Sequence, residues 1–239
     1  MNGSSTKTLP ARACAVVIGA SGGIGGAVAE SLAASQRYSK IFGFRRDGDW
    51  AIDVTREESI ASAAAQVAAA EMTVRLVFIA TGFLHNEEFM PEKSWRDLDA
   101  RELQHAFLVN AIGPALVMKH FLPLLPPRGR SVCAALSARV GSIEDNRLGG
   151  WHSYRASKAA LNQLIRTCAI ELKRRRPEAI CVALHPGTVA TGLSRPFSKV
   201  GLEVRRPSDA AKGLLAVLDQ LAPDDSGGFF DYSGARIPW

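Results

Sequence analysis

Tyr154 and Lys158 stand four positions apart in the run Tyr-Arg-Ala-Ser-Lys. On an α-helix this spacing places both side chains on one face. A free phenol has a pKa of about 10 and exchanges protons poorly at neutral pH, but a neighbouring ammonium favours the phenolate and lowers that pKa. The pair therefore has the chemistry of a general acid/base. The alternative is a helix on which the lysine is simply solvated.

A glycine-rich turn near the start of the chain has the context of a nucleotide-binding site. The apolar run 13–18 predicts a strand buried on both faces, and the alanine-rich stretch after the turn predicts a helix through Ala33. Glycines at this place let a diphosphate approach the amides of a helix N-terminus. A plain glycine-rich turn is the alternative. The spacing is GxxxGxG, and the positions assigned to the cofactor are Gly19, Ser21, Gly23, Ile24 and Gly25.

The end of the second predicted strand favours one cofactor over another. This strand, 40–44, runs into Arg45 and Arg46, and a third predicted strand, 50–52, ends at Asp53. An acidic residue after the second strand would hold ribose hydroxyls, whereas arginine there can pair with a 2′-phosphate. Arg45, with Arg46 as a helper, therefore predicts NADP(H) over NAD(H). Asp53 is placed to meet the adenine, and an exposed turn residue is its alternative reading.

Strands and helices alternate along the rest of the chain. Thr55 followed by Glu58 is a capping-box pattern at the start of a helix. The alternation predicts a Rossmann-type, doubly wound α/β fold, with a mostly parallel sheet and helices on both faces. We expect one domain over 12–239 and a disordered tail over 1–11. Further strands are predicted at 74–79, 131–136, 180–184 and 229–232, helices at 55–70, 100–122, 154–174 and 208–221, and a loop with Leu193, Phe197, Val200 and Leu202.

Two more polar residues could belong to a site. Ser137 follows the predicted strand 131–136, at the carboxyl edge where open α/β sheets bind ligands, although a serine there could equally cap a turn. Asn110 lies in an apolar helix, where an amide is most often a structural hydrogen-bonding group. The segment 138–152 is a candidate substrate wall.

Composition argues against several other classes. Hydrophobic residues make up 47% of the chain, yet no apolar run reaches the length of about 18 residues that a membrane span needs. The N-terminus does not resemble a signal peptide, so we expect a cytoplasmic protein without a membrane span. The net charge is +6, but the densest basic run, 173–176, lies where a helix should end, which disfavours nucleic-acid binding.

The cysteines and histidines show no ligand spacing. The four cysteines are widely separated inside apolar segments, which predicts buried reduced thiols. The five histidines form no HExxH or similar motif, so we predict no metal site.

Taken in order, these motifs resemble the short-chain dehydrogenase/reductase family from about residue 12 to the C-terminus. Within that family the runs 153–162 and 185–191 are most similar to the branch that contains the signalling protein C-factor and the sniffer-type carbonyl reductases. The motifs are Gly19-x-x-x-Gly23-x-Gly25, Asn110-Ala-x-Gly113, Ser137, Tyr154-x-x-x-Lys158 and Pro186-Gly187.

The resemblance implies a role for each catalytic candidate. Tyr154 would protonate the carbonyl oxygen during reduction, and Ser137 would hold that oxygen. Lys158 would bond the nicotinamide ribose and lower the tyrosine pKa, while Asn110 would support a water relay.

The resemblance also implies cofactor contacts outside the glycine turn. The backbone around Val189 and the hydroxyl of Thr191 would fix the nicotinamide carboxamide. The family's Asn-Asn-Ala-Gly motif is replaced here by residues 79–82, and the interval from Ser137 to Tyr154 is longer than in many members, which predicts an enlarged loop over the pocket. The complete set of expected contacts adds Val54, Ala80, Gly82, Tyr154, Lys158, Pro186 and Gly187 to those named above.

The leading functional hypothesis is therefore an NADP(H)-dependent carbonyl reductase or alcohol dehydrogenase that acts on a small, apolar carbonyl or alcohol. The alternative is a cofactor-binding signalling or redox-sensor protein on the same fold. Long helices at 100–122 and 154–174 have broad apolar faces, and the family resemblance implies a homodimer or homotetramer through them.

Overall fold

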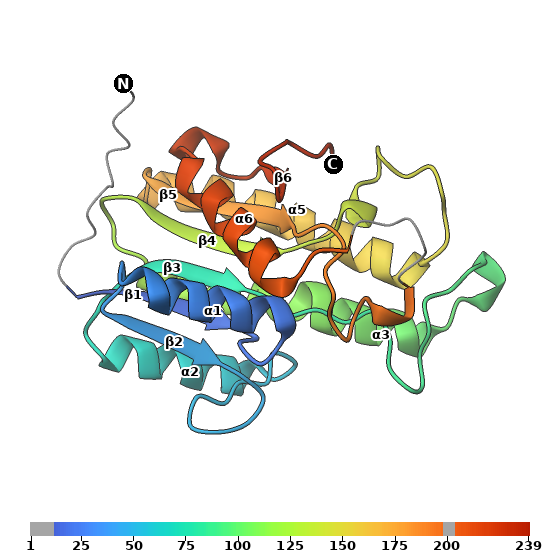
Figure 1. Cartoon of the computed structure of the whole chain (residues 1–239), viewed down its shortest axis with the longest axis horizontal. Helices are drawn as coiled ribbons and strands as arrows, with labels where there is room; N and C mark the ends of the chain where they lie inside the picture. Colours follow the sequence, from blue (N-terminus) through green and yellow to red (C-terminus); the bar gives the residue numbers. More distant parts are fainter. Residues whose placement is uncertain (1–11, 198–203) are drawn as a thin grey trace.

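Parallel strands form a single sheet with the order β2-β1-β3-β4-β5-β6 (Figure 1). The structure is a computed structural model that describes residues 12–197 and 204–239. The predicted tail and the predicted loop residues Val200 and Leu202 lie outside this part. The strands are β1 Ala13–Ile18, β2 Lys40–Phe44, β3 Thr73–Ile79, β4 Ser131–Leu136, β5 Ala179–His185 and β6 Phe229–Asp231.

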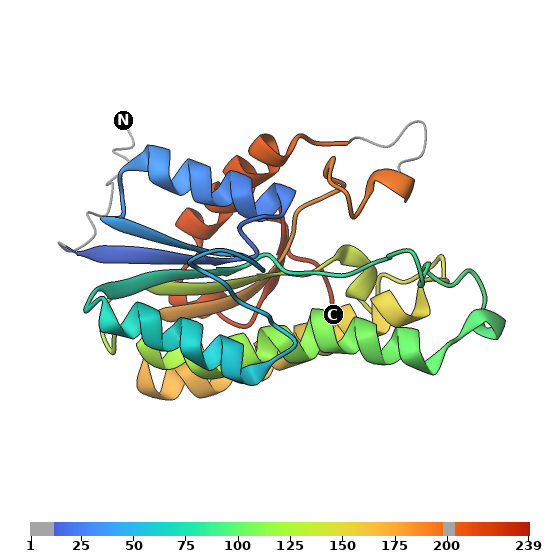
Figure 2. The ribbon, with the colours of Figure 1, turned by 90° about the horizontal axis from the view of Figure 1, so that it is seen from below.

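Helices cover both faces of this sheet, as Figure 2 shows edge-on. Apolar residues of α1 and α6 pack on one face, and those of α2, α4 and α5 pack on the other. The predicted doubly wound Rossmann-type fold is thus confirmed, with every strand pairing parallel in the described sheet. The helices are α1 Gly23–Ser35, α2 Glu57–Ala69, α3 Ala100–Phe107, α4 Gly113–Phe121, α5 His152–Arg175 and α6 Pro207–Gln220.

The central strands are apolar throughout because both of their faces are covered. In β1, Cys14, Val16 and Ile18 point to the core under α2 and α4, whereas Ala15 and Val17 point to the core under α1 and α6. Their side chains alternate because successive residues of a strand face opposite ways.

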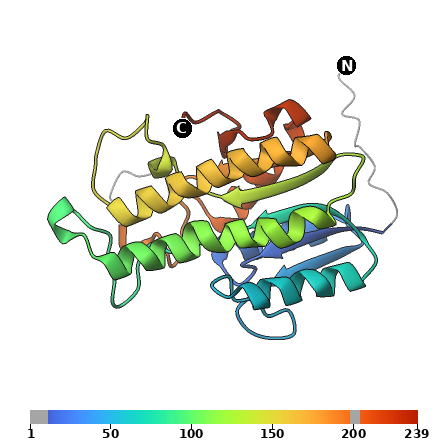
Figure 3. The same cartoon turned by 180° about the vertical axis from the view of Figure 1, so that it is seen from behind.

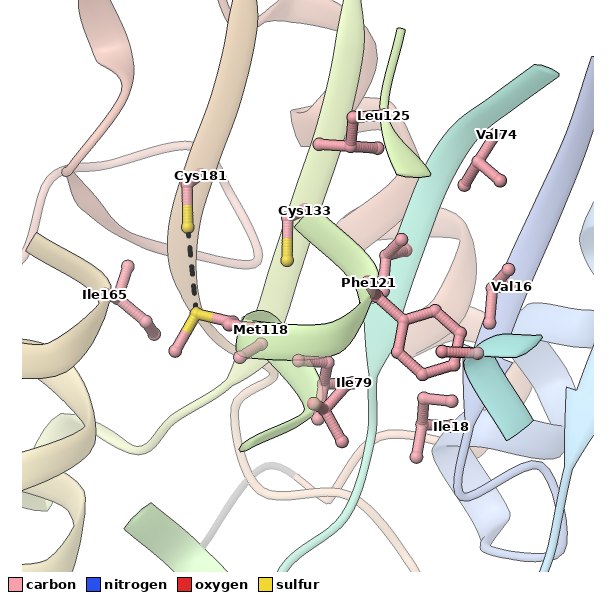
Figure 4. Packing of buried hydrophobic residues seen from close by; sticks show 14 of the residues in the cluster. Val16, Ile18, Val74, Ile79, Met118, Phe121, Leu125, Cys133, Ile165 and Cys181 are labelled. Carbon is pink, nitrogen blue, oxygen red and sulfur yellow. Dashed lines mark hydrogen bonds between the residues drawn. The ribbon is translucent and has the colours of Figure 1, made fainter. Parts of the chain in front are cut away.

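The cysteines are free thiols, as predicted. Cys14, Cys133 and Cys181 are buried, and Cys168 is partly exposed. Figure 4 shows Cys133 and Cys181 on neighbouring strands, with the Cys181 Sγ 3.9 Å from the Met118 Sδ. Burial raises the pKa of the Cys14 thiol to about 11, which keeps it protonated and unreactive.

The predicted strand at 50–52 is wrong. This segment makes one isolated bridge, between Arg45 and Ala51. The Trp50 ring packs edge-on against Phe42 at a centroid distance of 5.1 Å, which holds the segment beside β2. Beyond it the Asp53 amide donates to the Ser59 hydroxyl (2.9 Å), so the chain turns away before a second rung can form.

The predicted capping box at Thr55 is also wrong. Helix α2 begins at Glu57, and its N-cap position is Arg56, which makes no side-chain cap. The Thr55 hydroxyl instead donates to the Asp53 Oδ1 (2.6 Å), so the hydroxyl is used in the preceding turn.

One continuous helical segment of the described chain, Ala100–Leu124, is long and apolar enough to cross a membrane, with a mean hydropathy of 1.4. It contains α3, a π-helical turn at Leu108–Ile112, and α4. The Val117, Met118 and Phe121 side chains on this segment are fully buried against the sheet. Part of its apolar surface therefore belongs to the protein core, and Ile112 on the same segment is exposed.

Candidate active site

The structure brings the predicted site residues together at the carboxyl edge of the sheet. Gly19, Ala80, Ser137 and Pro186 each follow the end of a strand, and those strands are neighbours. A Cβ atom on Gly19 would lie 3.2 Å from the Ala80 carbonyl carbon, so the first two of these turns are in contact.

The glycine-rich turn is shaped by its lack of side chains. Gly19 has a φ of +88°, which favours glycine, and a Cβ atom on Gly25 would lie 2.2 Å from the Gly19 oxygen. Helix α1 has no side-chain cap at Gly22 and no acidic residue in its first turn. Its N-terminus is therefore suited to an anion such as a diphosphate.

The opposite side of this turn is formed by the segment after β5. A Cβ atom on Gly23 would lie 2.9 Å from the Thr191 Cγ2, which places Thr191 beside the start of α1. Gly187 has a φ of +76° and packs under the Tyr232 ring, while Val189 is buried. Thr81, between the predicted contacts Ala80 and Gly82, has a buried hydroxyl with no hydrogen-bond partner in the described structure.

The residues assigned to the adenosine end of the cofactor do not share one environment. Arg45 and Arg46 are exposed at the end of β2. The Asp53 Oδ1 accepts from the amide and the hydroxyl of Thr55, and these bonds lower the pKa of the Asp53 carboxyl. Asp53 is thus held in a turn and is half-buried, and its contact with the adenine stays a prediction. The Val54 oxygen lies 2.7 Å from the point that a Gly113 Cβ would occupy.

Asn110 lies in the π-helical turn and is fully buried. Its Oδ1 accepts from the Phe83 amide (2.7 Å), and its Nδ2 donates to the Phe83 oxygen (2.8 Å) and the Ser157 Oγ (3.0 Å). Such π turns occur often at functional sites. The Asn110 side chain therefore links Phe83, in the segment after β3, to Ser157 of α5, the residue directly before Lys158.

Ser137 is held by a residue that the sequence analysis missed. Its Oγ donates to the Asn162 Oδ1 (2.7 Å), and both side chains are buried. Asn162 lies four positions after Lys158, so the helical spacing that links Tyr154 to Lys158 could have found it.

Lys158 is buried and reaches the end of β4. Its Nζ donates to the Leu136 oxygen (2.9 Å) and lies 5.8 Å from the centroid of the Tyr154 ring. A Cβ atom on Gly82 would lie 3.6 Å from that Nζ and 3.7 Å from the Asn110 Oδ1. The Lys158 and Asn110 side chains therefore meet beside Gly82, and the Lys158 Nζ lies between this point and the Leu136 oxygen to which it is bonded.

The pKa of Tyr154 is shifted in the direction opposite to the expected one, and that of Lys158 is shifted as well. Burial raises the pKa of the Tyr154 phenol and lowers that of the Lys158 ammonium to about 7. Transfer from water to a buried site disfavours the charged form of either group, and here this effect dominates. The expectation that Lys158 lowers the tyrosine pKa is not met in this structure.

An aromatic wall adjoins Tyr154, and the sequence analysis, which placed Trp151 in the candidate substrate wall and Phe197 in a loop, did not connect its members. The Trp151 ring contacts the Tyr154 ring at a centroid distance of 6.2 Å and the Phe197 ring at 5.2 Å. The His85 ring lies 5.3 Å from the Phe197 ring. We call Trp151, Phe197 and His85 the aromatic wall. They come from three separate loops, so no sequence spacing connects them.

Comparison with known proteins agrees with this geometry. A family model described as enoyl-(acyl carrier protein) reductase matches residues 28–211, which include Asn110, Ser137, Tyr154 and Lys158. C-signal of Myxococcus xanthus is 38% identical over 144 residues, covering 60% of this chain and 82% of that protein. The 1-hydroxy-2-glutathionyl-2-methyl-3-butene dehydrogenase of Rhodococcus sp. (strain AD45) is 32% identical over 189 residues, covering 79% and 78% of the two chains.

A solved structure matches nearly the whole chain. The NADPH-bound carbonyl reductase from chicken fatty liver superposes with a TM-score of 0.83 at 26% sequence identity. The match covers 97% of this chain and 100% of that one.

The lowered pKa of Lys158 predicts a specific pH dependence of stability. Between the folded pKa of about 7 and the usual value of 10.5, the unfolded chain binds a proton that the folded chain does not. Stability from this group is therefore lost at low pH and gained as pH rises. Relative to Lys158→Met, the parent should gain up to about 2.5 kcal/mol between pH 7 and pH 9, since one pKa unit is worth about 1.4 kcal/mol. Urea unfolding of both proteins measures it.

The exposed Lys212 supplies the control for that experiment. Lys212→Met should leave the difference between pH 7 and pH 9 unchanged. A parallel pH dependence in the parent and Lys158→Met would contradict the assignment.

Proposed function

The chain belongs to the short-chain dehydrogenase/reductase family, and from this premise we propose that it is an NADP(H)-dependent reductase of a small, apolar carbonyl compound, or a dehydrogenase of the corresponding alcohol. The observation that carries the proposal is the meeting of Lys158 and Asn110 beside Gly82, with the Tyr154 ring centroid 5.8 Å from the Lys158 Nζ, at the sheet edge that also holds the glycine-rich turn. The expected resemblance to the branch with carbonyl reductases agrees with the chicken structure.

Tyr154 would act as the proton donor in the reductive direction. Burial raises its pKa, so the phenol holds its proton at neutral pH, and the ammonium form of Lys158 would be needed to make it a stronger acid. When bound, the nicotinamide would supply the hydride. Tyr154 would give its proton to the substrate oxygen, and the Ser137 hydroxyl, oriented by Asn162, would hold that oxygen.

Lys158 would act on both the cofactor and the tyrosine. With its pKa at about 7, its charge is sensitive to small changes around it. In this proposal the Lys158 Nζ bonds the ribose, and the polar surroundings that this creates favour the ammonium. Asn110, whose side chain already bonds Phe83 and Ser157, keeps the segment after β3 in place.

The residues present fit a dinucleotide. The uncapped N-terminus of α1 and the glycines at 19, 23 and 25 would take the diphosphate, and Thr81, next to Gly19, has a buried hydroxyl without a partner in the described chain. Arg45, exposed at the end of β2, would pair with a 2′-phosphate. The chicken carbonyl reductase has NADPH bound, which supports the same cofactor here.

The substrate side supports an apolar carbonyl. The aromatic wall places Trp151 directly beside Tyr154. Aromatic faces pack on apolar groups, which supports an apolar substrate beside the tyrosine.

A signalling role on the same fold is a second candidate, because C-signal of Myxococcus xanthus is 38% identical over 144 residues. Retention of Ser137, Tyr154 and Lys158 favours the enzyme. Measured turnover of a carbonyl or alcohol substrate distinguishes the enzyme from the signalling protein.

Replacing Tyr154 by phenylalanine tests the proposed reaction. Loss of the proton donor should lower turnover at least about a hundredfold, because the phenyl ring keeps the packing but not the hydroxyl. NADPH affinity should change little. The measurement is a screen of carbonyl compounds and alcohols with NADPH and NADP⁺, followed by kcat and Kd for the best substrate.

Tyr38→Phe is the matched control, since Tyr38 lies in a groove between α1 and α6 on the far side of the sheet. It should retain full activity. Reduction by Tyr154→Phe within a few fold of the parent would shift the assignment to the signalling candidate.

Arg45→Ala tests the cofactor preference. The parent should bind NADPH more tightly than NADH, because a guanidinium and a phosphate form charge-assisted hydrogen bonds. In the variant this preference should shrink about tenfold or more, with NADH affinity unchanged. Titration of both cofactors measures it, with Arg128→Ala as the control. Equal affinities in the parent would refute NADP(H) preference.

Self-association through the long helices is also proposed. Figure 3 shows α4 and α5 side by side on one face, and Ile112 and Ile170 on this layer are 45% and 49% exposed. Sedimentation at micromolar concentration should show a dimer or tetramer, and Ile170→Glu should shift it toward monomer. Ile143→Glu, on a loop and 78% exposed, is the control. A monomeric parent would contradict the proposal.

A further inference from the structure

The catalytic helix α5 begins without a cap of its own. Trp151 occupies the N-cap position in the left-handed conformation, with a φ of 55°, and its side chain makes no capping hydrogen bond. The first turn of α5 contains no acidic residue. The first amides of a helix have no partners within it, so those at this buried end need acceptors from elsewhere.

Glu92, from the segment between β3 and α3, supplies these acceptors. Both of its carboxylate oxygens accept from the Ser153 amide, at 3.1 and 3.2 Å, and one of them also accepts from the Ser153 hydroxyl. The Glu92 backbone oxygen accepts from the Trp151 amide at 2.5 Å. Glu92 thus caps a helix that begins 60 positions further along the chain, and the side chains of Glu92 and Ser153 are both buried.

The burial of Glu92 is costly unless its bonds are made. Its side chain is 3% exposed, and it takes part in no ion pair within residues 12–197 and 204–239. A buried carboxylate without a cation needs hydrogen-bond donors in compensation, and a helix N-terminus adds a favourable dipole. The charge of Glu92 is therefore coupled to the position of the first turn of α5.

Tyr154 lies in this first turn, directly after Ser153. On its other side, Arg155 donates to the oxygens of Gly150 (2.9 Å), Val140 (3.1 Å) and Gly149 (3.1 Å). The Trp151 ring, whose amide is bonded to Glu92, contacts the tyrosine ring. The backbone around Tyr154 is consequently held on both sides. Glu92 holds the side of Ser153, and the hydrogen bonds of Arg155 hold the other.

The geometry points to Glu92 as a positioning residue for Tyr154: by capping α5 from the β3–α3 segment, it sets where the phenol stands at the sheet edge. This inference rests on the proposed role of Tyr154 as proton donor. A displacement of about 1 Å in a reacting group can cost on the order of a hundredfold in rate, so loss of the cap should act on the proton-transfer step.

Three variants test this inference in the full-length protein. Glu92→Ala removes every acceptor of the side chain, whereas Glu92→Gln keeps an oxygen for the Ser153 amide and an NH₂ group for its hydroxyl. Glu178→Ala is the matched control, because the Glu178 Oε1 also accepts from a backbone amide, that of Gly129 (2.6 Å), on an exposed part of the chain. Each protein is assayed for kcat, KM, NADPH affinity, and the isotope effect with NADPH deuterated at the transferred position.

Glu92→Ala should lower kcat at least about tenfold and raise the isotope effect, with NADPH affinity within about twofold of the parent. Glu92→Gln should recover most of kcat, and Glu178→Ala should resemble the parent. An alanine variant with parental kcat and isotope effect would overturn the inference. A fall in kcat that Glu92→Gln does not rescue would overturn the capping explanation as well.

Amide hydrogen exchange of residues 150–156 provides a readout that needs no substrate. Faster exchange there in Glu92→Ala, with the rest of the sheet unchanged, supports the inference, and unchanged exchange overturns it. A parent without any carbonyl reductase activity would refute the proposed function, yet the exchange result would still decide whether Glu92 orders the Tyr154 backbone. If Glu92→Ala does not fold, Ser153→Ala removes the hydroxyl bond alone and is judged by the same criteria.

Discussion

The hydrogen bond from the Lys158 Nζ to the Leu136 oxygen is the contact on which the arrangement of the site depends. It joins the buried face of α5 to the end of β4, immediately before Ser137. The turn after β4 also approaches α5 closely, since a Cβ atom on Gly141 would lie 2.7 Å from the Lys158 Cβ. A buried ammonium is costly, and this one has a backbone oxygen as its acceptor. Because the helix lies so near the strand end, Tyr154, Ser137 and Asn162 share one small region of the sheet edge.

Most of the fold could be predicted because its signals are local. Apolar runs such as 13–18 and alanine-rich helices follow from periodicity, and burial on both faces explains why the strands lack alternation. The prediction of a strand at 50–52 was wrong although its residues are typical of a strand. The contact of the Trp50 ring and the hydrogen bond from the Asp53 amide to the Ser59 hydroxyl determine the path of this segment instead. Such competing contacts are tertiary and leave no pattern in a short window.

The candidate site was predictable to the extent that its residues share one element or one sheet edge. Tyr154 and Lys158 share a helix face, and Ser137 ends a strand. Glu92 and, in the aromatic wall, His85 and Phe197 come from segments that no spacing relates to α5. The directions of the pKa shifts also depend on burial, and a sequence specifies which groups are neighbours along a helix but not how much water reaches them.

Because residues 50–52 do not form a strand, β2 lies at the edge of the sheet, and an isolated bridge joins Arg45, directly after β2, to Ala51. An edge strand presents unpaired backbone groups and can add a strand from another molecule, so folded proteins protect such edges with charge or bulk. Here the Lys40 Nζ lies 4.7 Å from the Phe42 ring centroid and 5.2 Å from that of Trp50. A cation over two aromatic rings at an exposed strand makes intermolecular strand addition unfavourable. Trp50, on the segment that follows Arg45, thereby helps to keep the charge of Lys40 at this edge of the sheet.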